Sequence, residues 1–143
     1  MNDAEWRSFV SAGTRTGKVA VQRENGRPHV TPVWFLLDDS DPTDVRVVFN
    51  SGVDSLKGKA LRRDPHFAMA VDDQQPPYSF VLLECTAELI EEPEQLRTSA
   101  TKIAHRYVGP EQAEAVGARN GVPGEYLVRG RIDKVTAQAD LAA

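Results

Sequence analysis

The chain has 143 residues, of which 41% are hydrophobic and 27% are charged, and its formal net charge at pH 7 is -4. This length and hydrophobic content predict one domain, over residues 1–143, with a core of its own. A net negative charge produces no field that attracts nucleic acid or an anionic membrane, so neither is expected as a partner. Any anion-binding site must therefore be local.

The cysteine content and the first residues of the chain indicate a cytoplasmic protein. The single cysteine, Cys85, cannot form an internal disulfide, and residues 1–10 lack the basic start and apolar run of a signal peptide. The apolar runs elsewhere are far shorter than a membrane span. The histidines share no metal-ligand spacing, so no metal site is predicted.

Hydrophobic patterning predicts six strands. Residues 18–23 alternate in polarity, and the Asn25-Gly26 pair that follows them fits a tight hairpin turn. The segment 78–90 alternates after Leu83, which indicates one buried and one exposed face. The predicted strands cover residues 18–23, 29–37, 45–49, 67–71, 78–90 and 126–135.

Apolar residues at helical spacing predict three or four short helices. The first lies within residues 1–13, with Asn2 or Asp3 as its cap, and the second has Ser51 or Asp54 as its cap. The predicted helices cover residues 1–13, 54–63, 93–108 and 111–118. Residues 136–143 are expected to form a loosely held tail.

These elements favour a mainly β fold with short helices. Short strands joined mainly by hairpins pair antiparallel, and closing such a sheet into a barrel removes the exposed edges through which molecules would otherwise associate. The predicted fold class is a six-stranded antiparallel β-barrel.

Four segments together resemble the pyridoxamine-phosphate-oxidase-like family of split β-barrels. A Gly-Arg-Pro-His hairpin is followed by a Ser-x-Lys-x-x-x-Leu-Arg-Arg-Asp-Pro segment, and the resemblance covers roughly residues 10–135. The Arg106-Tyr107-Val-Gly stretch is most similar to the actinobacterial branch that uses the deazaflavin coenzyme F-420. The segments are residues 17–21, 25–35, 47–51 and 55–65.

The resemblance implies a homodimer with a cofactor in the groove between the subunits. Lys57 matches the phosphate-contacting lysine of the family, and the start of a helix beside it adds N–H donors. The strand 31–34 is expected to meet the ring, and Lys59, Arg62 and Arg63 to meet a longer anionic tail. The candidate cofactor-binding residues are Thr31, Pro32, Val33, Trp34, Phe49, Asn50, Ser51, Gly52, Ser55, Lys57 and Lys59.

The activity that the resemblance implies is hydride transfer from reduced F-420 to an electron-poor unsaturated or quinone-like small molecule. FMN is the alternative cofactor. The cofactor itself transfers the hydride and the protein positions the reactants, so no catalytic side chain is assigned. A proton, where needed, would come from His29, Tyr78 or solvent. The acceptor is expected beside the 72–77 loop or the turn near Tyr126.

Other interpretations of the same residues remain open. A non-catalytic carrier of F-420, FMN or haem would need the same phosphate site. Lys57 and Lys59 also fit the solvated face of a helix, and Trp34 and Phe49 also fit a core. The chain ends without the arginine-rich segment that holds substrate phosphate in pyridoxamine-phosphate oxidases, so vitamin B6 oxidation is not expected.

Overall fold

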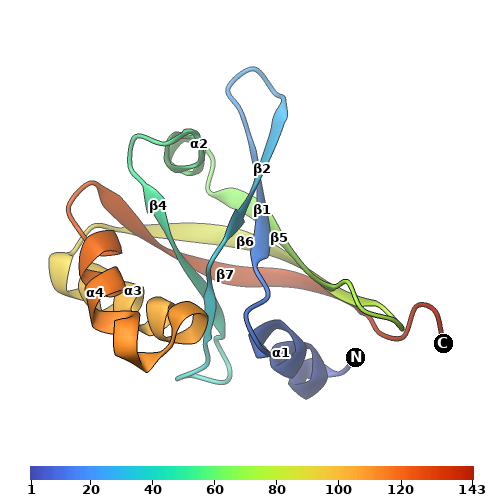
Figure 1. Cartoon of the computed structure of the whole chain (residues 1–143). Coiled ribbons are helices and arrows are strands. Elements are labelled where there is room, and N and C mark those ends of the chain that lie inside the picture. The colour runs from blue at the N-terminus through green and yellow to red at the C-terminus, as the bar shows by residue number, and fades with distance from the viewer.

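One antiparallel sheet of seven strands forms the body of the molecule, and four helices pack around it (Figure 1). A computed structural model describes all 143 residues. The elements are α1 (Asp3–Ser11), β1 (Gly17–Gln22), β2 (Pro28–Val33), β3 (Leu36–Asp38), β4 (Arg46–Gly52), α2 (Leu56–Arg63), β5 (His66–Asp73), β6 (Ser79–Ile90), α3 (Pro93–Val108), α4 (Pro110–Asn120) and β7 (Glu125–Gln138). The predicted mainly β antiparallel fold class is confirmed.

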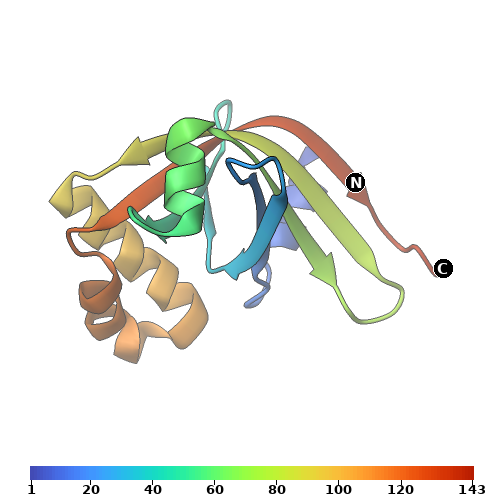
Figure 2. The ribbon, with the colours of Figure 1, turned by 90° about the horizontal axis from the view of Figure 1, so that it is seen from above.

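The two outer strands of the sheet are consecutive in the sequence. The strand order is β2-β1-β5-β6-β7-β4-β3, so β2 and β3 lie at opposite ends although only Trp34 and Phe35 separate them. The chain therefore passes directly from one edge of the curved sheet to the other and closes the gap of a split barrel (Figure 2).

The prediction of six strands was wrong because the expected strand 29–37 is divided. Residues up to Val33 pair with β1, and residues from Leu36 pair with β4. Between them Phe35 is fully buried, and its N–H donates to the hydroxyl of Tyr107 at 3.2 Å instead of to a strand. This tertiary contact ends β2 and lets the chain cross to the other edge.

The main core lies on the inner face of the curved sheet. Alternating residues of β1, β4, β5 and β6 contribute to it, and a bulge between Glu84 and Cys85 shifts the alternation of β6 against β7. Burial raises the pKa of the Cys85 thiol to about 12, so this cysteine packs as an inert apolar group. The largest fully buried core residues include Phe35, Phe49, Leu61, Met69 and Leu83.

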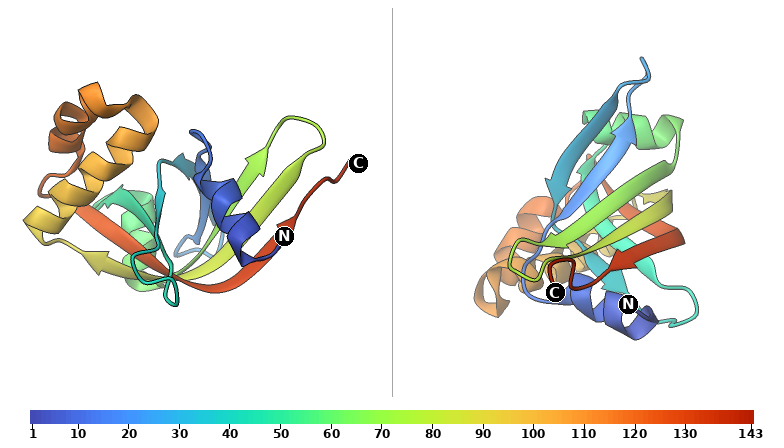
Figure 3. Two further views of the ribbon diagram at one scale, coloured as in Figure 1. Left: turned by 90° about the horizontal axis from the view of Figure 1, so that it is seen from below. Right: turned by 90° about the vertical axis from the view of Figure 1, so that its right-hand side faces the viewer.

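The helices cover different parts of the barrel. α1 is capped by Asn2, which forms a capping box with Glu5, and it buries Trp6 and Val10. α3 lies on the outer face of β4 and β7, where Leu96 and Ile103 join a small second core, and α4 packs against α3 (Figures 1 and 3). None of the helices is long and apolar enough to cross a membrane.

The C-terminal strand is longer than the sequence predicts. β7 pairs with β6 up to Gln138, opposite Phe80, so the expected loose tail at 136–143 begins inside a strand. Beyond it, the N–H of Leu141 donates to the carbonyl oxygen of Tyr78 at 2.9 Å. The long β6–β7 ladder accounts for the difference, because pairing with a neighbour orders residues whose own composition favours no structure.

Candidate functional site

A pocket of about 260 Å³ lies where α2, α3 and α4 approach the ends of β2, β4 and β7. Five of the predicted cofactor-binding residues line it, although they come from three separate elements and the segment after β2. The complete lining is Pro32, Val33, Trp34, Asn50, Lys57, Ala100, Ile103, Asn120 and Glu125. The sequence did not point to the four residues from Ala100 onward as site residues.

The turn from β4 into α2 sets the position of the lysine. Ser55, not Ser51 or Asp54, is the N-cap: its hydroxyl accepts from the Gly58 N–H at 3.0 Å and donates to the Gly52 carbonyl at 2.7 Å. Ser51 is buried, with its hydroxyl 3.3 Å from that of Ser55. These hydroxyls therefore hold the turn, and neither of the predicted site residues Ser51 and Ser55 lines the pocket.

A glycine in the first turn of α2 lets the helix lie against the end of β4. A Cβ atom at Gly58 would overlap the carbonyl oxygen of Gly52, which no side chain tolerates. The close approach brings Lys57, the preceding residue, toward β2.

Lys57 is half-buried and forms one side of the pocket. Its ammonium group donates to the hydroxyl of Thr31 at 3.1 Å, so the predicted residue Thr31 positions the lysine. Burial lowers the pKa of Lys57, and the carboxylate of Glu125 partly offsets this effect. A cation that is partly desolvated and held by one neutral partner is well suited to bind an anion.

Glu125 lies opposite Gly52 in the β4–β7 ladder, and its Oε2 atom is 3.2 Å from the place where a Gly52 Cβ would stand. The lack of a side chain at Gly52 thus makes room for the carboxylate. Burial raises the pKa of Glu125, and Lys57 opposes that shift. Sequence reasoning missed Glu125; the only signal was its place in the turn before Tyr126, where an acceptor surface was expected.

Asn50 presents an unpaired acceptor. Its Nδ2 donates to the carbonyl oxygen of Asn120 at 3.4 Å, whereas its Oδ1 is buried and has no hydrogen-bond partner. Leaving a buried acceptor unpaired costs on the order of 1–3 kcal/mol, so such an atom calls for an explanation.

Trp34 forms another wall of the pocket, and Tyr107 supports it from outside the lining. Trp34 is 37% exposed and is stacked on Tyr107 with ring centroids 5.1 Å apart. The Tyr107 hydroxyl donates to the Arg15 carbonyl at 2.8 Å and accepts from the Phe35 N–H. Its neighbour Arg106 donates to the carbonyl oxygens of Val10, Gly13 and Phe35 at 2.8, 3.0 and 2.8 Å. The end of α3 therefore fixes the crossing segment that carries Trp34.

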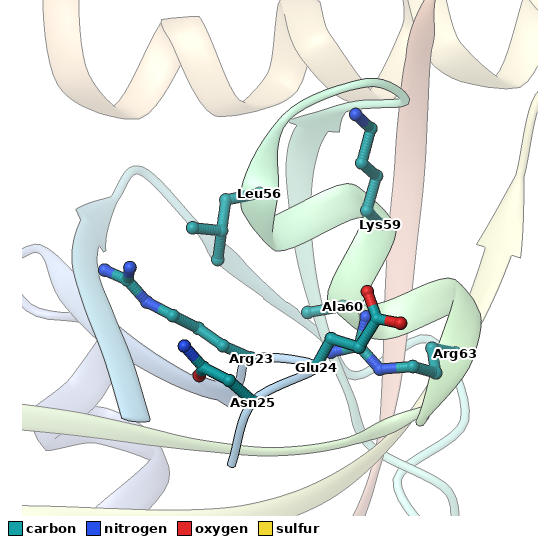
Figure 4. Close-up of a pocket in the computed structure, with 7 residues that line it drawn as sticks. All are labelled: Arg23, Glu24, Asn25, Leu56, Lys59, Ala60 and Arg63. Carbon is teal, nitrogen blue, oxygen red and sulfur yellow. The ribbon is translucent and has the colours of Figure 1, made fainter. Parts of the chain in front are cut away.

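Two predicted site residues lie elsewhere. Phe49 is fully buried and packs edge-on against Phe67, so its side chain belongs to the core and cannot line a cofactor. Successive side chains of β4 point to opposite faces of the sheet, so Asn50 faces the pocket and Phe49 faces the core. Lys59 does not line that pocket and instead lines a second, open pocket of about 460 Å³ (Figure 4).

The second pocket lies between α2 and the loop that joins β1 to β2, and side chains of the helix and of the loop line it (Figure 4). Its lining consists of Arg23, Glu24, Asn25, Leu56, Lys59, Ala60 and Arg63. Arg63 also donates to the Gln22 carbonyl at 2.7 Å, and Arg62 donates to the Tyr126 hydroxyl at 2.9 Å. Arg62 is therefore engaged in holding α2 to β7.

The other loop expected beside an acceptor is remote. Residues 72–77 close the β5–β6 hairpin at the end of the molecule opposite α3 and α4 (Figure 1). Asp72 and Asp73 form ion pairs there with Lys18 and Arg15, both at 3.2 Å. Tyr78 belongs to the same turn, so it is not placed to supply a proton at the pocket.

Solved structures with this fold are similar over nearly the whole chain. A conserved hypothetical protein from Mycobacterium tuberculosis is 28% identical with a TM-score of 0.81, over 96% of this chain and 84% of that one. A protein described as an F420 reductase is 21% identical with a TM-score of 0.70, over 91% and 94%. An FAD-binding protein from Mesorhizobium loti is 17% identical with a TM-score of 0.68, over 96% and 94%.

No curated protein sequence matches the chain. The sequence model of one family, described as pyridoxamine 5'-phosphate oxidase, matches residues 3–139, which is nearly the full length. This match and the split-barrel topology agree with the motifs around the first hairpin and α2. The chain belongs to the pyridoxamine 5'-phosphate oxidase family.

Proposed function

We propose that this protein binds a flavin-type cofactor, coenzyme F-420 in preference to FMN, and uses it to reduce an electron-poor small molecule. The observation that carries the proposal is the convergence of Lys57, Trp34 and Asn50 on one pocket. A half-buried cation, a flat aromatic wall and an unpaired buried acceptor fit the phosphate, ring and polyol parts of such a cofactor.

The protein's own part in the reaction is binding and orientation. Lys57 holds the anionic phosphate, together with the backbone N–H groups of Leu56 and Lys57, which the Ser55 cap leaves free. Trp34, held by Tyr107, offers a flat surface against which a ring packs. The bound cofactor supplies the hydride when reduced, so no acidic or basic side chain is required for that step.

The preference for F-420 rests on the second pocket. The basic residues Arg23, Lys59 and Arg63 outnumber Glu24 in its lining, so this pocket is net positive, and it shares no residue with the pocket that contains Lys57. FMN has no group beyond its phosphate that could reach such a second pocket. F-420 carries a longer anionic tail that these side chains suit. The structural similarity to a protein described as an F420 reductase supports the same choice.

We also propose that the functional unit is a homodimer in which a second copy covers the outer face of β2. Val30 is 62% exposed there, and Pro32 and Trp34 continue the same exposed apolar row toward the pocket. Light scattering on the wild type and on Val30→Asp tests this: a dimer that Val30→Asp dissociates supports it, and a monomeric wild type contradicts it.

The cofactor assignment is tested by fluorescence titration with F-420 and FMN in parallel. Loss of a charge-assisted contact of about 1.5–3 kcal/mol in Lys57→Ala is expected to weaken F-420 binding about 10- to 150-fold. Lys102→Ala, which removes an exposed lysine of α3, is the matched control and should bind normally. Tighter binding of FMN, or no effect of Lys57→Ala, contradicts the assignment. Tight binding without reduction of any acceptor supports the alternative role of a cofactor carrier.

A further inference from the structure

Two acceptor groups without donors share one face of the β4–β7 ladder. Asn50 pairs with Leu127 and Gly52 pairs with Glu125, so Asn50 and Glu125 are diagonal neighbours whose side chains point to the same side. Gly52, which follows Asn50 on this face, contributes no side chain. Both groups line the pocket that also contains Lys57.

Neither acceptor is satisfied within the protein. The Nδ2 donor of Asn50 is directed to Asn120, which leaves the buried Oδ1 facing no donor. The half-buried Glu125 carboxylate accepts no hydrogen bond from a protein group, and only burial and the more distant charge of Lys57 shift its pKa. Lys57 donates to Thr31 instead. The pocket thus combines one cation with two unpaired acceptors.

This combination suits a ligand that carries an anion and hydroxyl groups side by side. A phosphate alone satisfies Lys57 but is repelled by Glu125, and an apolar chain leaves both acceptors unpaired. Hydroxyl groups on the carbons next to a phosphate donate to a carboxylate and an amide oxygen, and they also separate the phosphate from the carboxylate. The volume of about 260 Å³ is below that of most complete ligand pockets, so it fits a segment of a larger ligand.

We propose that Asn50 and Glu125 form a polyol-recognition pair, which accepts hydrogen bonds from the ribityl hydroxyls of a cofactor whose phosphate is held by Lys57. This inference deepens the proposed function, because it names the residues that recognise the segment between phosphate and ring. It distinguishes ribityl phosphates from phosphates on plain alkyl chains.

The test uses fragments that contain no ring. Binding of ribitol 5-phosphate and of pentyl phosphate to the full-length protein is measured by NMR titration. The wild type is expected to bind ribitol 5-phosphate at least about tenfold more tightly, which corresponds to about 1.4 kcal/mol. In Asn50→Ala and Glu125→Ala this ratio should fall toward one, with the affinity for pentyl phosphate unchanged or higher. Glu125→Gln, which keeps an acceptor oxygen, should retain part of the preference.

Glu114→Ala, at an exposed position of α4, is the matched control and should keep the wild-type ratio. The inference is overturned if the wild type binds the two phosphates equally, or if the Asn50 and Glu125 variants lose both ligands to the same extent. The NMR spectrum of each variant shows whether it remains folded. A ribitol preference without binding of F-420 or FMN would contradict the proposed function and leave this inference intact.

Discussion

The indole ring of Trp34 lies flat on the phenol ring of Tyr107, with centroids 5.1 Å apart and planes only 4° from parallel. The two residues are far apart in the sequence, and the contact joins the end of α3 to the crossing between β2 and β3. The Tyr107 hydroxyl accepts a hydrogen bond from the Phe35 N–H and donates one to the Arg15 carbonyl oxygen. Because these bonds fix Tyr107, the stacked pair is held in position in the absence of a ligand.

Removing that hydroxyl is expected to destabilise the fold and preserve the stacking. Tyr107→Phe leaves the Arg15 carbonyl and the Phe35 N–H without their partner, at a cost of about 1–3 kcal/mol. Urea unfolding measures this cost, and Tyr78→Phe, at an exposed tyrosine, is the control. An unchanged unfolding midpoint would show that the hydroxyl does not hold the crossing segment.

Arg106 cannot be replaced by lysine. Its guanidinium donates to three carbonyl oxygens from different segments, and an ammonium on a flexible chain does not reproduce that fork. Arg106→Lys is expected to lower the free energy of unfolding by about 2–4 kcal/mol. Arg97→Lys, at an exposed position of the same helix, should change the free energy of unfolding little. Equal effects of the two substitutions would show that the three hydrogen bonds of Arg106 do not stabilise the fold.

Gly58→Ala is expected to destabilise the fold, although alanine has a higher helix propensity than glycine. In an exposed helix the substitution stabilises by about 1 kcal/mol, but here the new methyl group meets the Gly52 carbonyl. Overpacking of this kind costs about 1–3 kcal/mol, and displacement of α2 should also weaken phosphate binding through Lys57. Thermal unfolding and phosphate titration of Gly58→Ala and of Lys102→Ala, at an exposed position of α3, give the comparison. A stabilised Gly58→Ala would disprove the close approach.

Asp38 is expected to contribute stability that is lost in acid. Hydrogen bonds from Ser40, then from Arg129, lower the pKa of Asp38 from 3.8 to about 2. Because the folded pKa is depressed, the stabilisation is fully present well above pH 3.8 and is lost as the pH falls toward 2.

Partial exposure of the Asp38–Arg129 pair reduces its contribution to about 1–2 kcal/mol. Asp38→Asn should therefore lower the free energy of unfolding by this amount at pH 7 and make it less dependent on pH between 4 and 2. Urea unfolding across this range, with the exposed Asp39→Asn as control, measures both effects. Equal pH slopes for wild type and Asp38→Asn would contradict the assignment.

Local patterns in the sequence were sufficient for most of the elements. Alternation around Val19, Val21 and Leu83 predicted strands, because a strand with one buried face repeats every two residues. Asn2 and Gly109 marked the start of α1 and the end of α3 through their capping chemistry. The hairpin and α2 motifs were sufficient to recognise the family and to single out Lys57.

Only the tertiary structure decided which of these residues meet. The division of β2 from β3 depends on Phe35 and Tyr107, and the place of Glu125 in the pocket depends on its register with Gly52. Phe49 and Asn50 are adjacent in the sequence but face the core and the pocket respectively. A single chain determines its own periodicity and turns, whereas the partner of each side chain depends on pairing between distant segments, which local composition does not encode.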